Sequence, residues 1–181
     1  VATAKVAIQK EREKAAQALA NARRQAQAPA EQAAAAATKA EGWLATGRTE
    51  AGDSTSEAVH AALAALEASC DTVKMRSLAA AEVAIDANFA ATVEAAAAVE
   101  VKVSDAVSVA MDAAKQTRDA LDELRAAIQA DKDAQAAMEV LQLEAAQHAT
   151  EAEKVNTVVV GTLTQLTELY ASTEHSSEQL E

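Results

Sequence analysis

Two histidines have carboxylate neighbours at helical spacing, which is how helical bundles bind metals. Glu57 and His60 stand three residues apart, as in the Glu-x-x-His motif of di-iron bundles. Such a centre needs this motif twice and two further glutamates, whereas Glu144 and His148 are four residues apart. We therefore expect no metal site. Glu57 should be a capping residue, His60 should be a surface residue in the first or second turn of a helix, and His148, on an apolar stripe, should be a core histidine.

The other reactive side chains form no catalytic pattern. Cys70 is the only cysteine, which excludes an intrachain disulfide. It has no basic neighbour before Lys74, so we expect a small buried hydrophobe rather than a nucleophile; pairing between chains is left open. No nucleophile elbow or phosphate-binding loop occurs. We expect a protein that is not an enzyme and binds no cofactor.

Carboxylates gather in two places without the glycine turn of a calcium loop, which predicts a solvated helix face. These are Asp119, Asp122 and Glu123, and Asp131 with Asp133. The net charge of −12 argues against nucleic acid as a partner. Residues 1–48 nevertheless carry eight lysines and arginines against four glutamates. This predicts a basic helix packed beside acidic ones.

The composition indicates which elements carry these side chains. Of 181 residues, 52 are alanine, four are glycine and one is proline. Sandwiches, barrels and alternating βαβ folds lack the turn residues they need here. The sequence therefore predicts an elongated all-α protein with closely spaced helices.

Glycines mark one evident loop. Gly42, Gly47 and Gly52 fall close together and are followed by Asp53 to Ser56, so a first helix is expected over residues 3–41, ended by Gly42. Pro29 predicts a kink or short break near Gln27. Ser54 and Glu57 have the spacing of a capping box for the second helix.

Larger apolar residues then recur at helical spacing. The first stripe is Val59, Leu63, Leu66, Cys70 and Val73, and after a slip it resumes as Leu78, Ala81, Ile85, Phe89, Ala96, Val99 and Val103. Another is Val107, Met111, Ala114, Leu121, Leu124 and Ile128, continuing as Met138, Leu141, Ala145, His148, Ala152, Val155, Val159, Leu166 and Tyr170.

A turn is expected at residues 99–105, where valines alternate with charged residues. It would separate two antiparallel helices of roughly 50 residues each. Gly161 predicts a joint before a short helix over 162–171, and 172–181 is a polar tail leading toward a membrane anchor. The predicted fold is an elongated antiparallel bundle of three long helices plus a shorter C-terminal helix, forming one domain over 1–171.

Trp43 and Leu44 are the candidate partner contacts. Both lie in the glycine loop, which a hairpin architecture places at one end of the bundle, and an exposed Trp-Leu pair suits a protein interface. The alternative is that Trp43 folds back and caps the core.

Two alanine-rich stretches, residues 15–39 and 79–103, resemble the glutamic acid/alanine-rich surface proteins of African trypanosomes. The resemblance implies an extended helical bundle, similar in shape to the N-terminal domain of variant surface glycoproteins. It also implies a cell-surface location through a C-terminal lipid anchor outside this chain. The function would be a dense protective coat, with neighbouring coat proteins as partners.

Two other functions are compatible with the same sequence. One is a helical-bundle surface receptor for a host or vector protein, with Trp43 as the first residue to examine. The other is an intracellular coiled-coil scaffold, in which the alanine-rich seam would bind partner helices.

Overall fold

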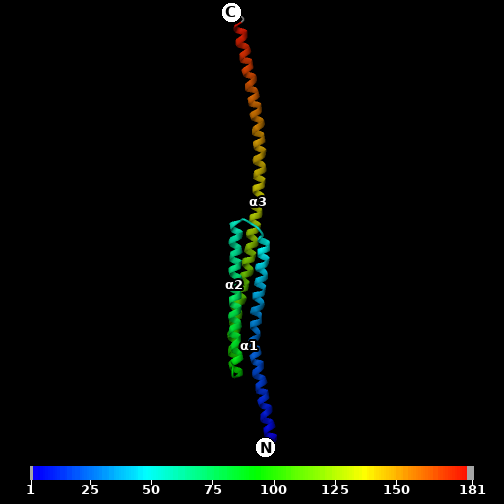
Figure 1. Cartoon of the computed structure of the whole chain (residues 1–181), viewed down its shortest axis with the longest axis vertical. Helices are drawn as coiled ribbons and strands as arrows, with labels where there is room; N and C mark the ends of the chain where they lie inside the picture. Colours follow the sequence, from blue (N-terminus) through cyan, green and yellow to red (C-terminus); the bar gives the residue numbers. More distant parts are fainter. Residues whose placement is uncertain (1, 179–181) are drawn as a thin grey trace. The chain divides into compact units, whose positions relative to one another are not determined.

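The computed structural model describes residues 2–178, with side chains over 5–172. It contains three α-helices and one 3-10 turn: α1 (Ala2–Ala51), α2 (Glu57–Ile85), η1 (Asp86–Phe89) and α3 (Val93–Glu178) (Figure 1). No strand occurs over the described residues. The predicted all-α class is confirmed.

The chain divides into two compact units, which we call unit 1 (Val1–Asp131) and unit 2 (Lys132–Glu181). Unit 1 contains α1, α2, η1 and α3 as far as Asp131, and its three helices pack together around a shared core. Unit 2 consists of the rest of α3.

The core of unit 1 repeats every seven residues on each helix, the period of a coiled-coil seam. The buried positions at this seven-residue spacing are Ala26, Ala33, Ala40 and Gly47 on α1, Val59, Leu66, Val73 and Ala80 on α2, and Ala96, Val103, Ala110, Thr117 and Leu124 on α3, with other buried residues between them. Since α1 contributes only alanine and glycine at this spacing, the larger side chains of α2 and α3 can pack against its backbone.

Gly47 shows how closely the helices approach. A Cβ atom there would lie 2.5 Å from Leu66 Cδ2 and 2.9 Å from Leu124 Cδ2. Both distances are shorter than carbon atoms tolerate. The absence of a side chain at Gly47 therefore leaves the space that the leucines of α2 and α3 fill at this point.

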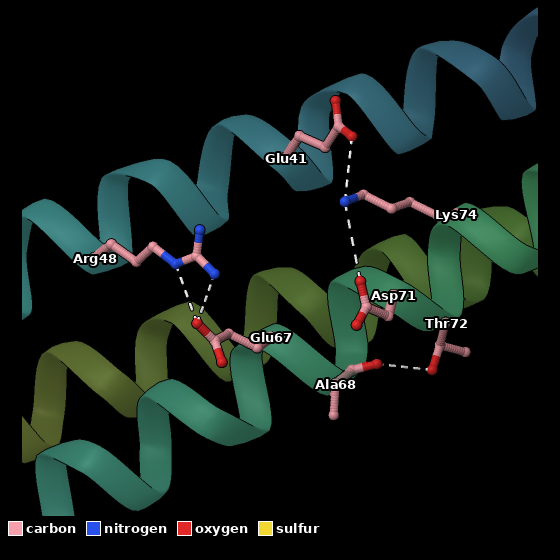
Figure 2. Close-up of polar contacts among 7 residues, drawn as sticks. All are labelled: Glu41, Arg48, Glu67, Ala68, Asp71, Thr72 and Lys74. Atoms are coloured by element: carbon pink, nitrogen blue, oxygen red, sulfur yellow. Dashed lines mark hydrogen bonds and ion pairs between the residues drawn. The ribbon is translucent and has the colours of Figure 1, made fainter.

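Ion pairs align the helices along the surface of unit 1 (Figure 2). Arg48 of α1 donates to Glu67 of α2 at 2.7 Å, and Lys74 lies 3.3 Å from Glu41. The two pairs run in opposite order along α1 and α2, so these helices are antiparallel. Each helix supplies one of the cations, Arg48 from α1 and Lys74 from α2. The predicted arrangement of a basic helix beside acidic ones therefore describes this interface only in part.

The predicted loop over residues 42–56 is wrong for most of its length. Helix α1 passes through Gly42 and Gly47 and ends at Ala51. A glycine inside a helix costs only about 1 kcal/mol, and the packing of the surrounding turns outweighs that cost. Gly52 is the glycine that makes the turn, with a φ of +51°. Pro29 lies within α1, and the expected break near Gln27 does not occur.

The capping box predicted at Ser54 is also wrong. Ser56 is the N-cap of α2, with an extended backbone and no side-chain cap. The Ser54 hydroxyl instead accepts a hydrogen bond from the Ser56 N–H at 3.2 Å and donates one to Asp131 Oδ2 at 3.2 Å. The loop is thereby fastened to α3.

The turn between the second and third helices lies earlier than residues 99–105. Helix α2 gives way to η1, and α3 begins at Val93. Thr92 Oγ1 accepts the Ala95 N–H at 3.1 Å and so caps α3. The adjacent Glu94 accepts hydrogen bonds from its own backbone N–H and from Thr92, which lowers the pKa of its carboxyl group.

Side chains of α1 hold this turn in place. The Arg23 guanidinium donates two hydrogen bonds to the Ala90 carbonyl, at 2.6 and 3.1 Å. Gln27 donates to Asn88 Oδ1 at 2.9 Å. None of these contacts has a periodic signature, which explains why the apolar pattern misplaces the turn.

The short C-terminal helix predicted over 162–171 is not a separate element. Helix α3 continues through Gly161 to Glu178. A single glycine without a neighbouring proline or cap does not end a helix. Of the predicted polar tail, residues 172–178 are helical and 179–181 lie outside the described residues.

The predicted apolar stripe of the second helix is wrong in its second half. Leu78, Ile85 and Phe89 are exposed, whereas Ser77 and Ala84 face the core. Small side chains let the helices approach closely. In this part of the chain the helix therefore buries the face with small residues and exposes the face with large apolar residues.

Candidate interaction surfaces

The residues with a metal-binding spacing do not form a metal site. His60 lies exposed in the first turn of α2, as expected, whereas Glu57 is the first residue of α2 and not the third residue that the capping box required. His148 is also exposed, with Nδ1 at 3.7 Å from Glu151 Oε2, so its prediction as a core histidine is wrong. Over the described residues, no group of three or more His, Cys, Asp or Glu side chains could hold a metal ion.

Cys70 is a free thiol in the core of unit 1, which confirms its prediction as a buried hydrophobe. Burial raises the pKa of the thiol, and the nearby Lys74 opposes this only in part. The reactive thiolate is therefore disfavoured at neutral pH.

Trp43 and Leu44 lie inside α1 rather than in a projecting loop, because α1 continues past the glycines. Leu44 is buried in the core, and half-buried Trp43 packs against the same cluster. Whether either contacts a partner stays a prediction.

Trp43 lines a groove of about 500 Å³ between α1 and α3 of unit 1. Met111 contributes an apolar wall, while Lys39, Lys115 and Arg118 contribute cations. No carboxylate lines this groove, although the whole chain carries a charge of −12. The groove therefore suits an anionic group with an apolar part. Its cations come from distant parts of the sequence, which is why the sequence pattern did not reveal them.

The second candidate surface is a row of side chains along unit 2, which we call the C-terminal stripe. Its members are Met138, Leu141, Ala145, His148, Ala152, Val155, Val159, Thr162, Leu166 and Leu169. All are exposed, with Met138, Leu141 and Val155 between 61% and 63% exposed. The sequence prediction missed Thr162 and Leu169, although alternating steps of three and four residues from Met138 lead to both.

A shorter apolar row runs along the outer face of α2 and η1. Met75, Leu78, Ile85 and Phe89 are all more than half exposed. Exposed apolar rows of this kind are typical of protein interfaces.

Over the described residues, no helix is long and apolar enough to cross a bilayer. The apolar residues of the C-terminal stripe recur in steps of three and four, which is the spacing of a helix face that packs against another helix.

Comparisons with known protein families, curated proteins and solved structures find no match to this chain.

Proposed function

We propose that this chain is a non-enzymatic assembly protein, in which the helical bundle of unit 1 carries a helix that binds partner helices through the C-terminal stripe. This corresponds to the scaffold alternative among the functions compatible with the sequence. The same assembly could operate within a surface coat.

The exposure of the C-terminal stripe is the observation that carries this proposal. Every described side chain over residues 132–172 is exposed, yet the stripe keeps the apolar period of a packed helix. An isolated helix gains little stability in water, because most helical stability in proteins comes from packing an apolar face. A partner helix would supply that packing.

A photoreactive residue can test this proposal in cells that produce the protein. Placed at Ala152 on the stripe, it should cross-link to a helical segment, either of another protein or of this one. Thr150 is also exposed but lies on the opposite side of the helix, and provides the control. Equal cross-linking from both positions would contradict the proposal.

A surface coat is the second candidate function, and the resemblance to trypanosome surface proteins supports it. A bundle of narrow, closely packed helices would occupy little membrane area per molecule. The charge of −12 would keep crowded neighbours soluble. In this proposal the partners are neighbouring coat proteins and the plasma membrane, reached through a lipid anchor outside this chain.

Antibody labelling of intact cells tests the coat. Surface signal released by a phospholipase that cleaves glycolipid anchors would support it. Signal that appears only after permeabilisation would exclude it and leave the scaffold.

A surface receptor is the third candidate, favoured by the cationic groove beside Trp43. Substitution of Lys115 by Glu should weaken binding of a host protein by reversing a charge in the groove. Exposed Lys132 belongs to unit 2 and does not line the groove, so Lys132→Glu is the control. A pull-down from host serum with both variants would reveal whether binding depends on the groove.

A further inference from the structure

We propose that the partner of the C-terminal stripe is the same stripe of a second copy, paired as a parallel, in-register, two-stranded coiled coil. This inference rests on the proposed function and names its partner. It is drawn from the register of α3, from the charges beside the stripe and from the polar residues within it.

The stripe continues the register of the seam that is already packed in unit 1. From Ala96, steps of seven reach Val103, Ala110, Thr117 and Leu124, all fully buried. Further steps of seven reach Asp131, Met138, Ala145, Ala152, Val159 and Leu166. The same heptad position is therefore covered by α1 and α2 in unit 1 and exposed in unit 2.

Asp131 marks the boundary between the two parts of this register. It occupies the same heptad position as Leu124 and Met138 and bonds Ser54 in the loop that joins α1 to α2. Beyond it the apolar period resumes. A coiled coil is the packing that such a period specifies.

The residues beside the stripe favour a parallel pair. In a parallel coiled coil, the residue directly before each member of this seven-residue register lies beside the residue five places later in the partner chain. Glu144 would meet Ala149 of the second copy, and Glu151 would meet Asn156. Neither contact opposes like charges. In an antiparallel pair, the residues directly before the register positions of one copy would face the same set of residues in the other copy. Within unit 2 this set includes both glutamates and no lysine or arginine, so no cation would face the glutamates.

Further along the stripe the same rule brings apolar residues together. Val158 would lie beside Leu163 of the second copy, which widens the apolar contact. Both side chains are more than half exposed in the single chain. The parallel pair would therefore cover apolar surface outside the stripe as well.

Polar members of the stripe favour alignment without a shift. His148 and Thr162 would each meet its own copy in an in-register pair. A shift by one heptad would place His148 against Leu141 or Val155 and leave the imidazole facing an apolar side chain. Polar residues at single seam positions commonly specify register in this way.

The oligomeric mass of the full chain is the first test. Sedimentation equilibrium should give the mass of two chains. The triple variant Leu141→Lys, Val155→Lys, Leu166→Lys should sediment as one chain. The matched control, Val140→Lys, Leu143→Lys, Val160→Lys, makes the same kind of change at exposed positions off the stripe and should remain a dimer.

Disulfide trapping tests the orientation. A cysteine at Ala145 should cross-link two chains under mild oxidation, because in-register pairing places this position against itself. A cysteine at the neighbouring Ala146, off the stripe, should not. Cys70 is buried and should stay reduced in both variants.

The outcomes separate this inference from the proposed function. A stripe-dependent dimer that fails to cross-link at position 145, or a complex of three or more chains, overturns the parallel pair but keeps helix binding through the stripe. Binding of the C-terminal stripe to the exposed apolar row of α2 on a second copy would also overturn the parallel pair and keep helix binding through the stripe. A monomeric chain that also lacks selective photo-cross-linking at Ala152 overturns both.

Discussion

At the scale of single residues, two glycines in the same helix have opposite surroundings. A Cβ atom at Gly47 would collide with the Leu66 and Leu124 side chains, whereas one at Gly42 would meet nothing within 4 Å. The same substitution at these two positions therefore separates helix propensity from core packing.

We expect Gly47→Ala to lower the free energy of unfolding of unit 1 by roughly 1–2 kcal/mol, since overpacking outweighs the gain in helix propensity. Gly42→Ala should raise it by up to about 1 kcal/mol. Urea unfolding followed by circular dichroism measures both. Equal stabilisation by the two alanines would show that the leucines move aside at little cost.

At the scale of elements, the turn between α2 and α3 depends on side chains from α1. Arg23 and Arg24 are neighbours with the same charge, but only Arg23 is placed to bind the Ala90 carbonyl. This carbonyl lies just after η1, where regular helical hydrogen bonding ends.

Arg23→Gln should destabilise unit 1 by about 1 kcal/mol, because a charge-assisted hydrogen bond to the turn is lost. Arg24→Gln should stay within about 0.5 kcal/mol of the wild type, since it removes the same charge from an exposed site. Hydrogen exchange at residues 86–92 should quicken in the first variant alone. Similar exchange in both would mean that Arg23 does not hold the turn.

At the scale of the whole molecule, the two units differ in what stabilises them. Unit 1 has a core of its own. In unit 2 every described side chain is exposed, so its helix should depend on association.

We expect two thermal transitions. The helical signal of unit 2 should melt at a temperature that falls by roughly 5–10 °C for each tenfold dilution, as mass action requires for a dimer, while that of unit 1 should not move. Circular dichroism over a range of protein concentrations measures this. A single transition that is independent of concentration would contradict an associating unit 2.

Local and periodic features of this protein were predictable from the sequence. The scarcity of glycine and proline and the spacing of apolar residues predicted an all-α chain, and the spacing around Cys70 predicted a buried thiol. Both follow from short-range physics, because helix period and backbone preference act over a few residues. The recurrence of apolar residues at heptad spacing from Met138 onward can likewise be read from the sequence alone.

Tertiary structure decided where the helices end and which faces are covered. Gly42 and Gly161 resemble helix ends but lie inside helices, while the turn at η1 is held by Arg23, distant in sequence. His148 lies on an apolar stripe, yet no helix covers that stripe in the described chain. A periodic pattern specifies a face to be packed, whereas the element that packs it depends on contacts between residues far apart in the chain.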